Sequence, residues 1–100
     1  MRSRDVIDRL KQAEPALRAM GVGALYLFGS HARGEAAADS DVDVFVDPAA
    51  DEAFGFLQFM KAYRTIVEAV GPNVDVGYST REGLSHYIRD SVEREARRIF

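Results

Sequence analysis

Two short apolar runs on either side of a glycine–serine turn constrain the fold of this chain more than any other feature. Residues 23–28 are glycine followed by apolar side chains, Gly29-Ser30 comes next, and residues 41–46 alternate aspartate with valine before Phe45. Runs of this length bounded by glycine and polar residues are typical of strands. The sequence therefore predicts two strands, joined by one helical turn at residues 31–34 and a polar loop at residues 35–39.

A helix is predicted before this unit. Residues 4–20 carry apolar side chains three and four positions apart, which is the spacing of one helix face. Ser3 is a candidate N-cap and Gly21 a candidate stop. Pro15 lies inside the pattern, so we expect a kink or an early break there.

A second long helix is predicted after the two strands. We interpret Asp47 as its cap and Pro48 as its first residue, a position that proline favours. Asp51 and Glu52 would suit the positive N-terminal end of such a helix. Gly71-Pro72 would stop it, about twenty residues later.

The remaining sequence predicts one more strand and one more helix. Residues 73–78 contain a short valine-rich strand, and Ser79 and Glu82 have the spacing of a capping box. The apolar stripe of the last helix then reaches Ile99. A helix that connects two strands normally makes them parallel neighbours. We therefore expect an α/β (α+β) fold with a small mixed three-stranded sheet flanked by helices, in the order helix, strand, helix, strand, helix, strand, helix.

Length and composition narrow the class of protein. A chain of 100 residues predicts one domain spanning residues 1–100. Its net charge of −3 argues against bulk attraction to nucleic acid or to an anionic membrane. It has no cysteine, which excludes disulfides and thiol catalysis. Without a long apolar run or an apolar segment behind the N-terminal charges, we expect a cytoplasmic protein with no membrane partner.

Three aspartates are the candidate metal ligands. Asp41 and Asp43 stand two residues apart on one predicted strand, so they project from the same face about 6–7 Å apart. Carboxylates suit Mg²⁺, which prefers oxygen ligands and sites shared with phosphate. Asp75 lies on the neighbouring predicted strand, and three acids suffice for a site with two metal ions. The alternative is that these carboxylates are ordinary polar residues at a solvated strand edge.

The turn at Gly29-Ser30 is the candidate phosphate-binding element. Glycine permits close approach of the backbone to a ligand, and Ser30 adds a hydroxyl group. Arg33 could neutralise triphosphate charge or could instead hold the turn by packing against acidic residues. His31 between them is expected at the surface. The chain lacks the lysine of the Walker P-loop, so this is a different kind of phosphate site.

These motifs together resemble those of the nucleotidyltransferases related to the polymerase beta palm, and among them the minimal nucleotidyltransferases. Their pattern is Gly-Ser, ten residues, then Asp-x-Asp, here Gly29-Ser30 followed by Asp41-Val42-Asp43. The longer signature is matched at Gly29, Ser30, Ala32, Arg33, Gly34, Ser40, Asp41 and Asp43. The third acid of the family maps onto Asp75.

The resemblance implies a function. Such enzymes use Mg²⁺, here through Asp41, Asp43 and Asp75, and move a nucleoside monophosphate, usually AMP from ATP, to a hydroxyl group. Minimal members of this size commonly act as antitoxins that adenylylate a tyrosine of a HEPN-type ribonuclease toxin. Two alternatives stay open. The chain could silence a partner by binding alone, or it could modify a small molecule or an RNA end.

Overall fold

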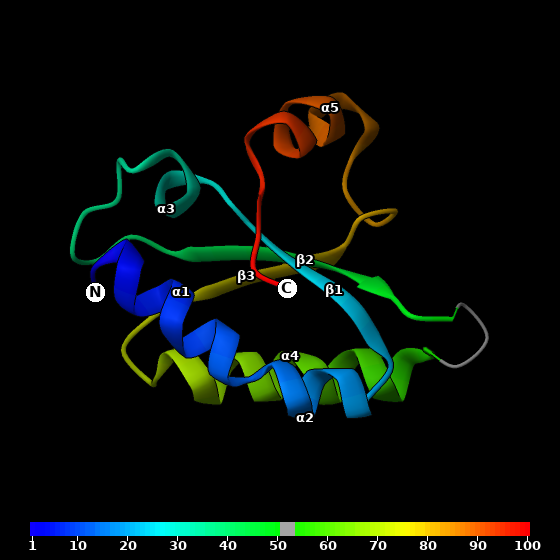
Figure 1. Cartoon of the computed structure of the whole chain (residues 1–100). Coiled ribbons are helices and arrows are strands. Elements are labelled where there is room, and N and C mark those ends of the chain that lie inside the picture. Colours follow the sequence, from blue (N-terminus) through cyan, green and yellow to red (C-terminus); the bar gives the residue numbers. More distant parts are fainter. Residues whose placement is uncertain (51–53) are drawn as a thin grey trace.

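The elements of the fold follow the predicted order, with the first helix divided in two and one short strand added at the end (Figure 1). The computed structural model describes residues 1–50 and 54–100. The elements are α1 (Ser3–Gln12), α2 (Glu14–Ala19), β1 (Val22–Phe28), α3 (Ser30–Arg33), β2 (Val42–Pro48), α4 (Phe56–Val70), β3 (Val76–Thr80), α5 (His86–Glu95) and β4 (Arg97–Arg98).

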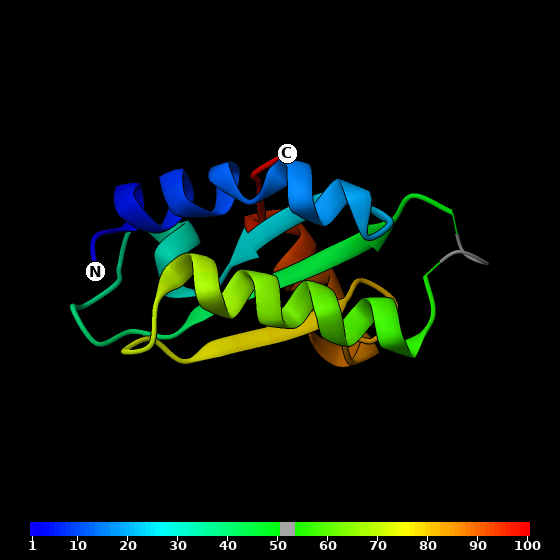
Figure 2. The same cartoon turned by 90° about the horizontal axis from the view of Figure 1, so that it is seen from below.

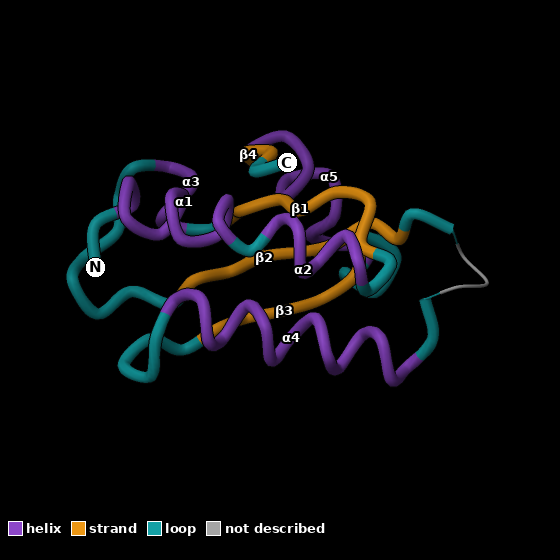
Figure 3. The backbone as a smooth tube through the Cα atoms, turned by 60° about the horizontal axis from the view of Figure 1, so that its bottom comes forward, coloured by secondary structure: helices purple, strands orange, loops and turns teal. Residues whose placement is uncertain are grey.

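The sheet is mixed, and its strands lie in the order β3-β2-β1-β4 (Figure 3). β1 and β2 are antiparallel, with Phe28 opposite Asp43. β2 and β3 are parallel, with Asp43 opposite Gly77. The parallel pair is the one that α4 connects, as the length of that connection predicted. The mixed sheet flanked by helices is thus confirmed, although it has four strands rather than three.

The two faces of the sheet are covered differently. α1, α2 and α4 pack on one face, whereas α5 lies on the other (Figure 2). The main core joins alternate side chains of β1 and β2 to the apolar stripes of the three helices, namely Val6, Leu10, Leu17, Leu25, Leu27, Val42, Val44, Val46, Ala62, Ile66 and Val70. On the opposite face a smaller cluster forms around Phe45, Leu84 and Val92. Within the described residues, no helix is both long and apolar enough to cross a membrane.

The first helix breaks where proline predicted a kink or a break. α1 ends at Gln12, and Pro15 lies in the first turn of α2, where a missing backbone N–H costs little. The predicted capping role of Ser3 is wrong, because Arg2 is the N-cap residue and Ser3 is already helical. The Ser3 hydroxyl instead makes a 2.9 Å hydrogen bond with Nδ1 of His31.

The predicted start of the second long helix is also wrong. Asp47 and Pro48 end β2, and α4 begins at Phe56 after Gly55. The Asp47 carboxylate forms an ion pair with Arg81 at 2.9 Å, a contact across the sheet that no local pattern reveals. The predicted roles of residues 51 and 52 at the start of this helix fall outside the described residues.

The third strand and the last helix are shifted along the chain from their predicted bounds. β3 covers Val76–Thr80 rather than residues 73–78, so Ser79 is a strand residue and the predicted capping box with Glu82 is wrong. The N-cap of α5 is Ser85, whose hydroxyl accepts a hydrogen bond from the backbone N–H of Tyr87 at 3.3 Å. This is also capping by a serine hydroxyl, six residues later than predicted.

The fourth strand forms where the last helix was expected to continue. α5 ends at Glu95, and Arg97 and Arg98 then pair with β1. The backbone N–H of Ile99 donates to the carbonyl of Leu25 at 2.8 Å, and the Ile99 side chain is buried in the main core. Satisfying the free backbone groups at the edge of β1 outweighs one more helical turn.

Truncation of Leu27 tests the main core. Leu27→Ala removes a fully buried side chain from β1 and leaves a cavity between the sheet and the helices. We expect the free energy of unfolding to fall by about 2–5 kcal/mol in urea denaturation. The matched control is Leu57→Ala, because Leu57 is 60% exposed and its truncation should change stability by no more than about 0.5 kcal/mol. Equal effects of the two variants would contradict this assignment of the core.

Candidate active site

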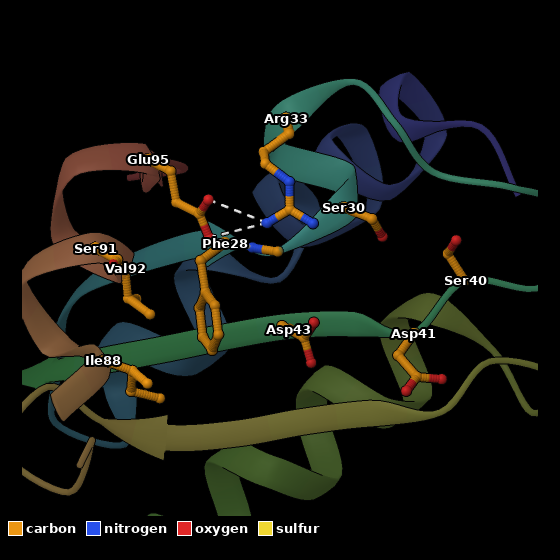
Figure 4. A pocket seen from close by; sticks show the side chains of 11 residues that line it. Phe28, Ser30, Arg33, Ser40, Asp41, Asp43, Ile88, Ser91, Val92 and Glu95 are labelled. Carbon is orange, nitrogen blue, oxygen red and sulfur yellow. Dashed lines mark hydrogen bonds and ion pairs between the residues drawn. The ribbon is translucent and has the colours of Figure 1, made fainter.

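A cavity opens between the N-terminal end of β2, the turn before α3 and one side of α5 (Figure 4). Its volume is about 550 Å³. The sequence-predicted residues Gly29, Ser30, Arg33, Asp41 and Asp43 all line it. Ser40 of the longer signature also lines it, and beside these residues lie side chains that the sequence did not single out for this site, namely Phe28, Ile88, Ser91, Val92 and Glu95.

The strand alternation predicted for residues 41–46 explains the acidic side of the cavity. Val42 is fully buried in the main core, so its neighbours Asp41 and Asp43 project from the opposite face of the sheet. Asp41 directly precedes β2 and is exposed, whereas Asp43 lies within the strand and is half-buried. Both side chains lie beneath the α3 turn in Figure 4.

Two glycines leave the space that the Asp43 carboxylate fills. A Cβ atom on Gly29 would lie 2.5 Å from Oδ2 of Asp43, and one on Gly77 would overlap Oδ1. Gly29 also has φ of +75°, a region that L side chains rarely adopt. The positive φ is what requires glycine at position 29, and the missing side chain also leaves the Asp43 carboxylate in place. Gly77 was not identified from the sequence, because its role depends on the parallel register between β2 and β3.

The electrostatic surroundings of Asp43 favour a cation. Burial raises the pKa of the Asp43 carboxyl group, and the negative charge of Asp41 raises it further. His31 and Arg33, which lie nearby, lower this pKa and so oppose the rise. A divalent cation between the two carboxylates would remove the repulsion, and carboxylate oxygens are the ligands that Mg²⁺ prefers. Asp41 and Asp43 are therefore the residues that would hold a Mg²⁺ ion here.

Asp75 does not join this pair in the structure. It lies just before β3, is exposed, and is not among the residues that line the cavity. Its backbone carbonyl accepts a 2.9 Å hydrogen bond from the N–H of Val42, so its backbone lies beside the start of β2. In the part of the chain that the structure describes, no group of three acidic, histidine or cysteine side chains is arranged to hold a metal ion. The role of Asp75 stays a prediction.

The turn before α3 forms another side of the same cavity. Gly29 is the N-cap residue of α3, and its carbonyl accepts from the N–H groups of Ala32 and Arg33, each at 3.1 Å. Ser30 begins the helix and lines the cavity. The short helix ends at Gly34, as predicted, with φ of +73°.

The sequence left two roles open for Arg33, neutralising a triphosphate or holding the turn against acidic residues, and the structure shows the second contact. Its guanidinium donates to both oxygens of Glu95, at 3.1 and 3.3 Å, and to Glu35 at 3.2 Å. These contacts raise the pKa of Arg33, with the hydrogen bond to Glu95 as the largest cause. Arg33 nevertheless lines the cavity, so its charge remains within reach of a bound anion.

His31 is not at the surface. Its side chain is 1% exposed and is held by the Ser3 hydroxyl from α1. No local sequence pattern predicts this burial, because the contact joins residues that are 28 positions apart. The hydrogen bond ties the start of α1 to the turn that carries Gly29-Ser30.

The class of protein follows from these features and from a match to a family model. The model of the nucleotidyltransferase domain matches residues 4–99. The chain therefore belongs to the nucleotidyltransferase domain family, and the resemblance to minimal nucleotidyltransferases drawn from its motifs is confirmed.

Three solved structures are similar to this chain. One, described as a candidate minimal nucleotidyltransferase, is 29% identical with a TM-score of 0.79 and aligns over 97% of this chain and 95% of its own. A candidate nucleotidyltransferase from Sulfolobus solfataricus is 17% identical, with a TM-score of 0.59 over 96% and 80% of the two chains. A toxin–antitoxin structure with AMP-PNP is 19% identical, with a TM-score of 0.60 over 100% and 73%. The last two establish a shared fold only. A comparison with curated proteins finds no match.

Substitution of Gly77 tests the space around Asp43. In Gly77→Ala the added methyl group meets the end of a flexible side chain, so the Asp43 carboxylate should rotate while the fold survives. We expect Mg²⁺, followed by NMR titration, to bind roughly tenfold more weakly. Gly55→Ala is the control, since a Cβ atom there meets only Oε1 of Gln58 at 3.5 Å. Unchanged Mg²⁺ affinity in Gly77→Ala would show that this glycine does not position the carboxylate.

The raised pKa of Asp43 also predicts how the stability of the protein depends on pH. Because this pKa is higher in the folded than in the unfolded state, the folded state binds more protons between the two values, and its stability falls as pH rises through that window. Asp43→Asn should therefore be more stable than the wild type at neutral pH. The difference should vanish below about pH 3.9, the ordinary pKa of aspartate. Urea denaturation at both pH values measures this, and a less stable variant at neutral pH would contradict it.

Proposed function

We propose that this chain transfers AMP from ATP to a hydroxyl group of a partner protein, and that the acceptor is a tyrosine of a HEPN-type ribonuclease toxin. In this role the chain is the antitoxin of a toxin–antitoxin pair. The observation that carries the proposal is the single cavity that joins the Asp41 and Asp43 carboxylates to the Gly29-Ser30 turn. Membership of the nucleotidyltransferase domain family supports the same chemistry.

Each part of the site has a role in this reaction. The Gly29 backbone and the Ser30 hydroxyl would orient the triphosphate, with Arg33 close enough to offset its charge. Asp41 and Asp43 would hold Mg²⁺, joined by Asp75 if that side chain turns toward them. When bound, Mg²⁺ neutralises phosphate charge and makes the acceptor hydroxyl easier to deprotonate.

The bond changes are those of an in-line displacement. The acceptor hydroxyl oxygen forms a bond to the α-phosphorus as the bond from that phosphorus to the pyrophosphate oxygen breaks, and pyrophosphate leaves. Asp75 is the proposed recipient of the hydroxyl proton. Most of the rate increase would come from positioning and charge neutralisation, as in other phosphoryl transfers.

A protein acceptor suits the surface around the cavity. Ile88 lines it and is 48% exposed, and its neighbour Tyr87 is 85% exposed. Large apolar side chains exposed beside a reaction site are typical of an interaction surface. The similarity to a toxin–antitoxin structure with AMP-PNP, although only a likeness of fold, supports a toxin as the partner.

The test is the intact mass of the partner after incubation with this chain, Mg²⁺ and ATP. The wild type should add whole AMP units, and Asp43→Asn should add none, because the variant loses a metal-binding charge while keeping the fold. Asp39→Asn is the matched control, since Asp39 is an exposed aspartate of the preceding loop that does not line the cavity. Full transfer by Asp43→Asn would exclude the proposed mechanism.

Silencing of the partner by binding alone is a second candidate function. It is favoured by the placement of Asp75, which is exposed and lies outside the cavity that Asp41 and Asp43 line. A variant that combines Asp41→Ala with Asp43→Ala separates the two functions. If this variant still inhibits the partner as strongly as the wild type, masking accounts for the inhibition. Loss of inhibition with retained binding supports AMP transfer.

A further inference from the structure

Glu95 is the one acidic residue in the cavity that the proposed function does not use. It ends α5, on the side of the cavity opposite the aspartates, and its side chain is 26% exposed (Figure 4). Its Oε1 accepts a hydrogen bond from the backbone N–H of Gly29 at 3.2 Å. Both of its oxygens also accept from Nη1 of Arg33, at 3.3 and 3.1 Å. A carboxylate therefore already occupies two donors of the turn.

These donors are the ones that the proposed function assigns to the triphosphate. A backbone N–H and a guanidinium group bind a phosphate oxygen in the same way that they bind a carboxylate oxygen. One oxygen of Glu95, Oε1, bridges the two donors, which is the position that a phosphate oxygen would take. Glu95 and a triphosphate therefore cannot use this pair of donors together.

The backbone that carries Glu95 is fixed. Directly after α5 the chain pairs with β1 through Arg97 and Arg98, and Ile99 and Phe100 are buried. The Phe100 carbonyl accepts from the N–H of Leu25 at 3.1 Å. These contacts hold the end of α5 beside the turn, so that Glu95 can leave the donors by rotation of its side chain without any opening of the helix.

This inference rests on the proposed function. We propose that the Glu95 carboxylate is an internal anion, which occupies the position at Gly29 and Arg33 where the triphosphate would bind. A nucleoside triphosphate must then displace this carboxylate. The displaced carboxylate then lies close to a highly charged ligand, with the charges of Asp41 and Asp43 nearby. Glu95 is thus a positioning residue: it holds Gly29 and Arg33 when no ligand is bound, and it lowers the affinity of the site for a triphosphate. A purely structural tether would have the opposite effect, since its loss would weaken nucleotide binding.

The sign of the affinity change tests this role. Glu95→Gln keeps the size of the side chain and removes its charge. We expect this variant to bind ATP with Mg²⁺, and also inorganic triphosphate, at least about fivefold more tightly than the wild type in calorimetric titration. This is the factor by which the repulsion between one pair of like charges in contact weakens binding in water. Glu93→Gln is the matched control, because Glu93 lies on the same helix but faces Arg81 at 3.5 Å. Equal or weaker binding by Glu95→Gln, or no binding by either protein, overturns the proposal.

The amide signal of Gly29 gives a second and independent readout. Without ligand, Glu95→Gln should shift this ¹⁵N–¹H signal, because its acceptor changes from a carboxylate to an amide oxygen. At saturation with inorganic triphosphate the signals of the two proteins should coincide, since the phosphate has become the acceptor. A difference that persists unchanged at saturation means that Glu95 was never displaced.

Failure of this inference is distinguishable from failure of the proposed function. Suppose that Glu95→Gln binds triphosphate more tightly but the wild type transfers no AMP to its partner. The proposed function is then wrong, and the role of Glu95 stands. If the wild type transfers AMP and Glu95→Gln has an unchanged affinity for triphosphate, only the proposed role of Glu95 is wrong.

Discussion

Every part of the site depends on the alternation of side chains along β2. Val42 and Val44 enter the main core, so Asp43 and Phe45 must project from the other face. On that face the two side chains have different neighbours. Phe45 is covered by α5 and Arg81, whereas Asp43 lies toward the end of the strand beside Gly29. One strand thus carries both a buried anchor and an accessible carboxylate, and a shift of its register by one residue would turn both toward the main core and move Val42 and Val44 to the face of the site.

The cavity exists because the second face of the sheet is only partly covered. α5 has ten residues and packs through Leu84 before it and Val92 within it against Phe45. The short strand β4 then returns the chain to β1, which fixes how far α5 can extend over the sheet. The same geometry delivers Glu95 to the turn. The accessible end of β2 and its internal anion therefore arise from one topological feature, the return of the chain to the edge of β1.

The sequence revealed those parts of the fold that depend on local patterns. β1, the turn, the short helix, β2 and the parallel pairing of β3 were predictable because alternation, glycine and helix length each act over a few residues. The start of α4 was not, since Asp47 has the composition of a cap yet pairs with Arg81, 34 positions away. β4 and the burial of His31 likewise depend on contacts between distant segments. Most of the polar motif residues line one cavity, with Asp75 outside it, whereas Gly77 and Glu95 carry no sequence signal.

The distribution of charge in the cavity explains why Arg33 has an internal partner. Asp41, Asp43 and Glu95 line the cavity with Arg33 as its single lining cation among the described residues. Burial and Asp41 raise the pKa of Asp43, and Glu95 adds to the rise, so the carboxylates repel one another. Arg33 draws Glu95 away from that pair toward the turn. In the proposed reaction a magnesium–triphosphate complex would bring both signs of charge at once, a cation for the aspartates and an anion for Arg33. Such a complex would therefore suit the charges of the lining residues better than either component alone.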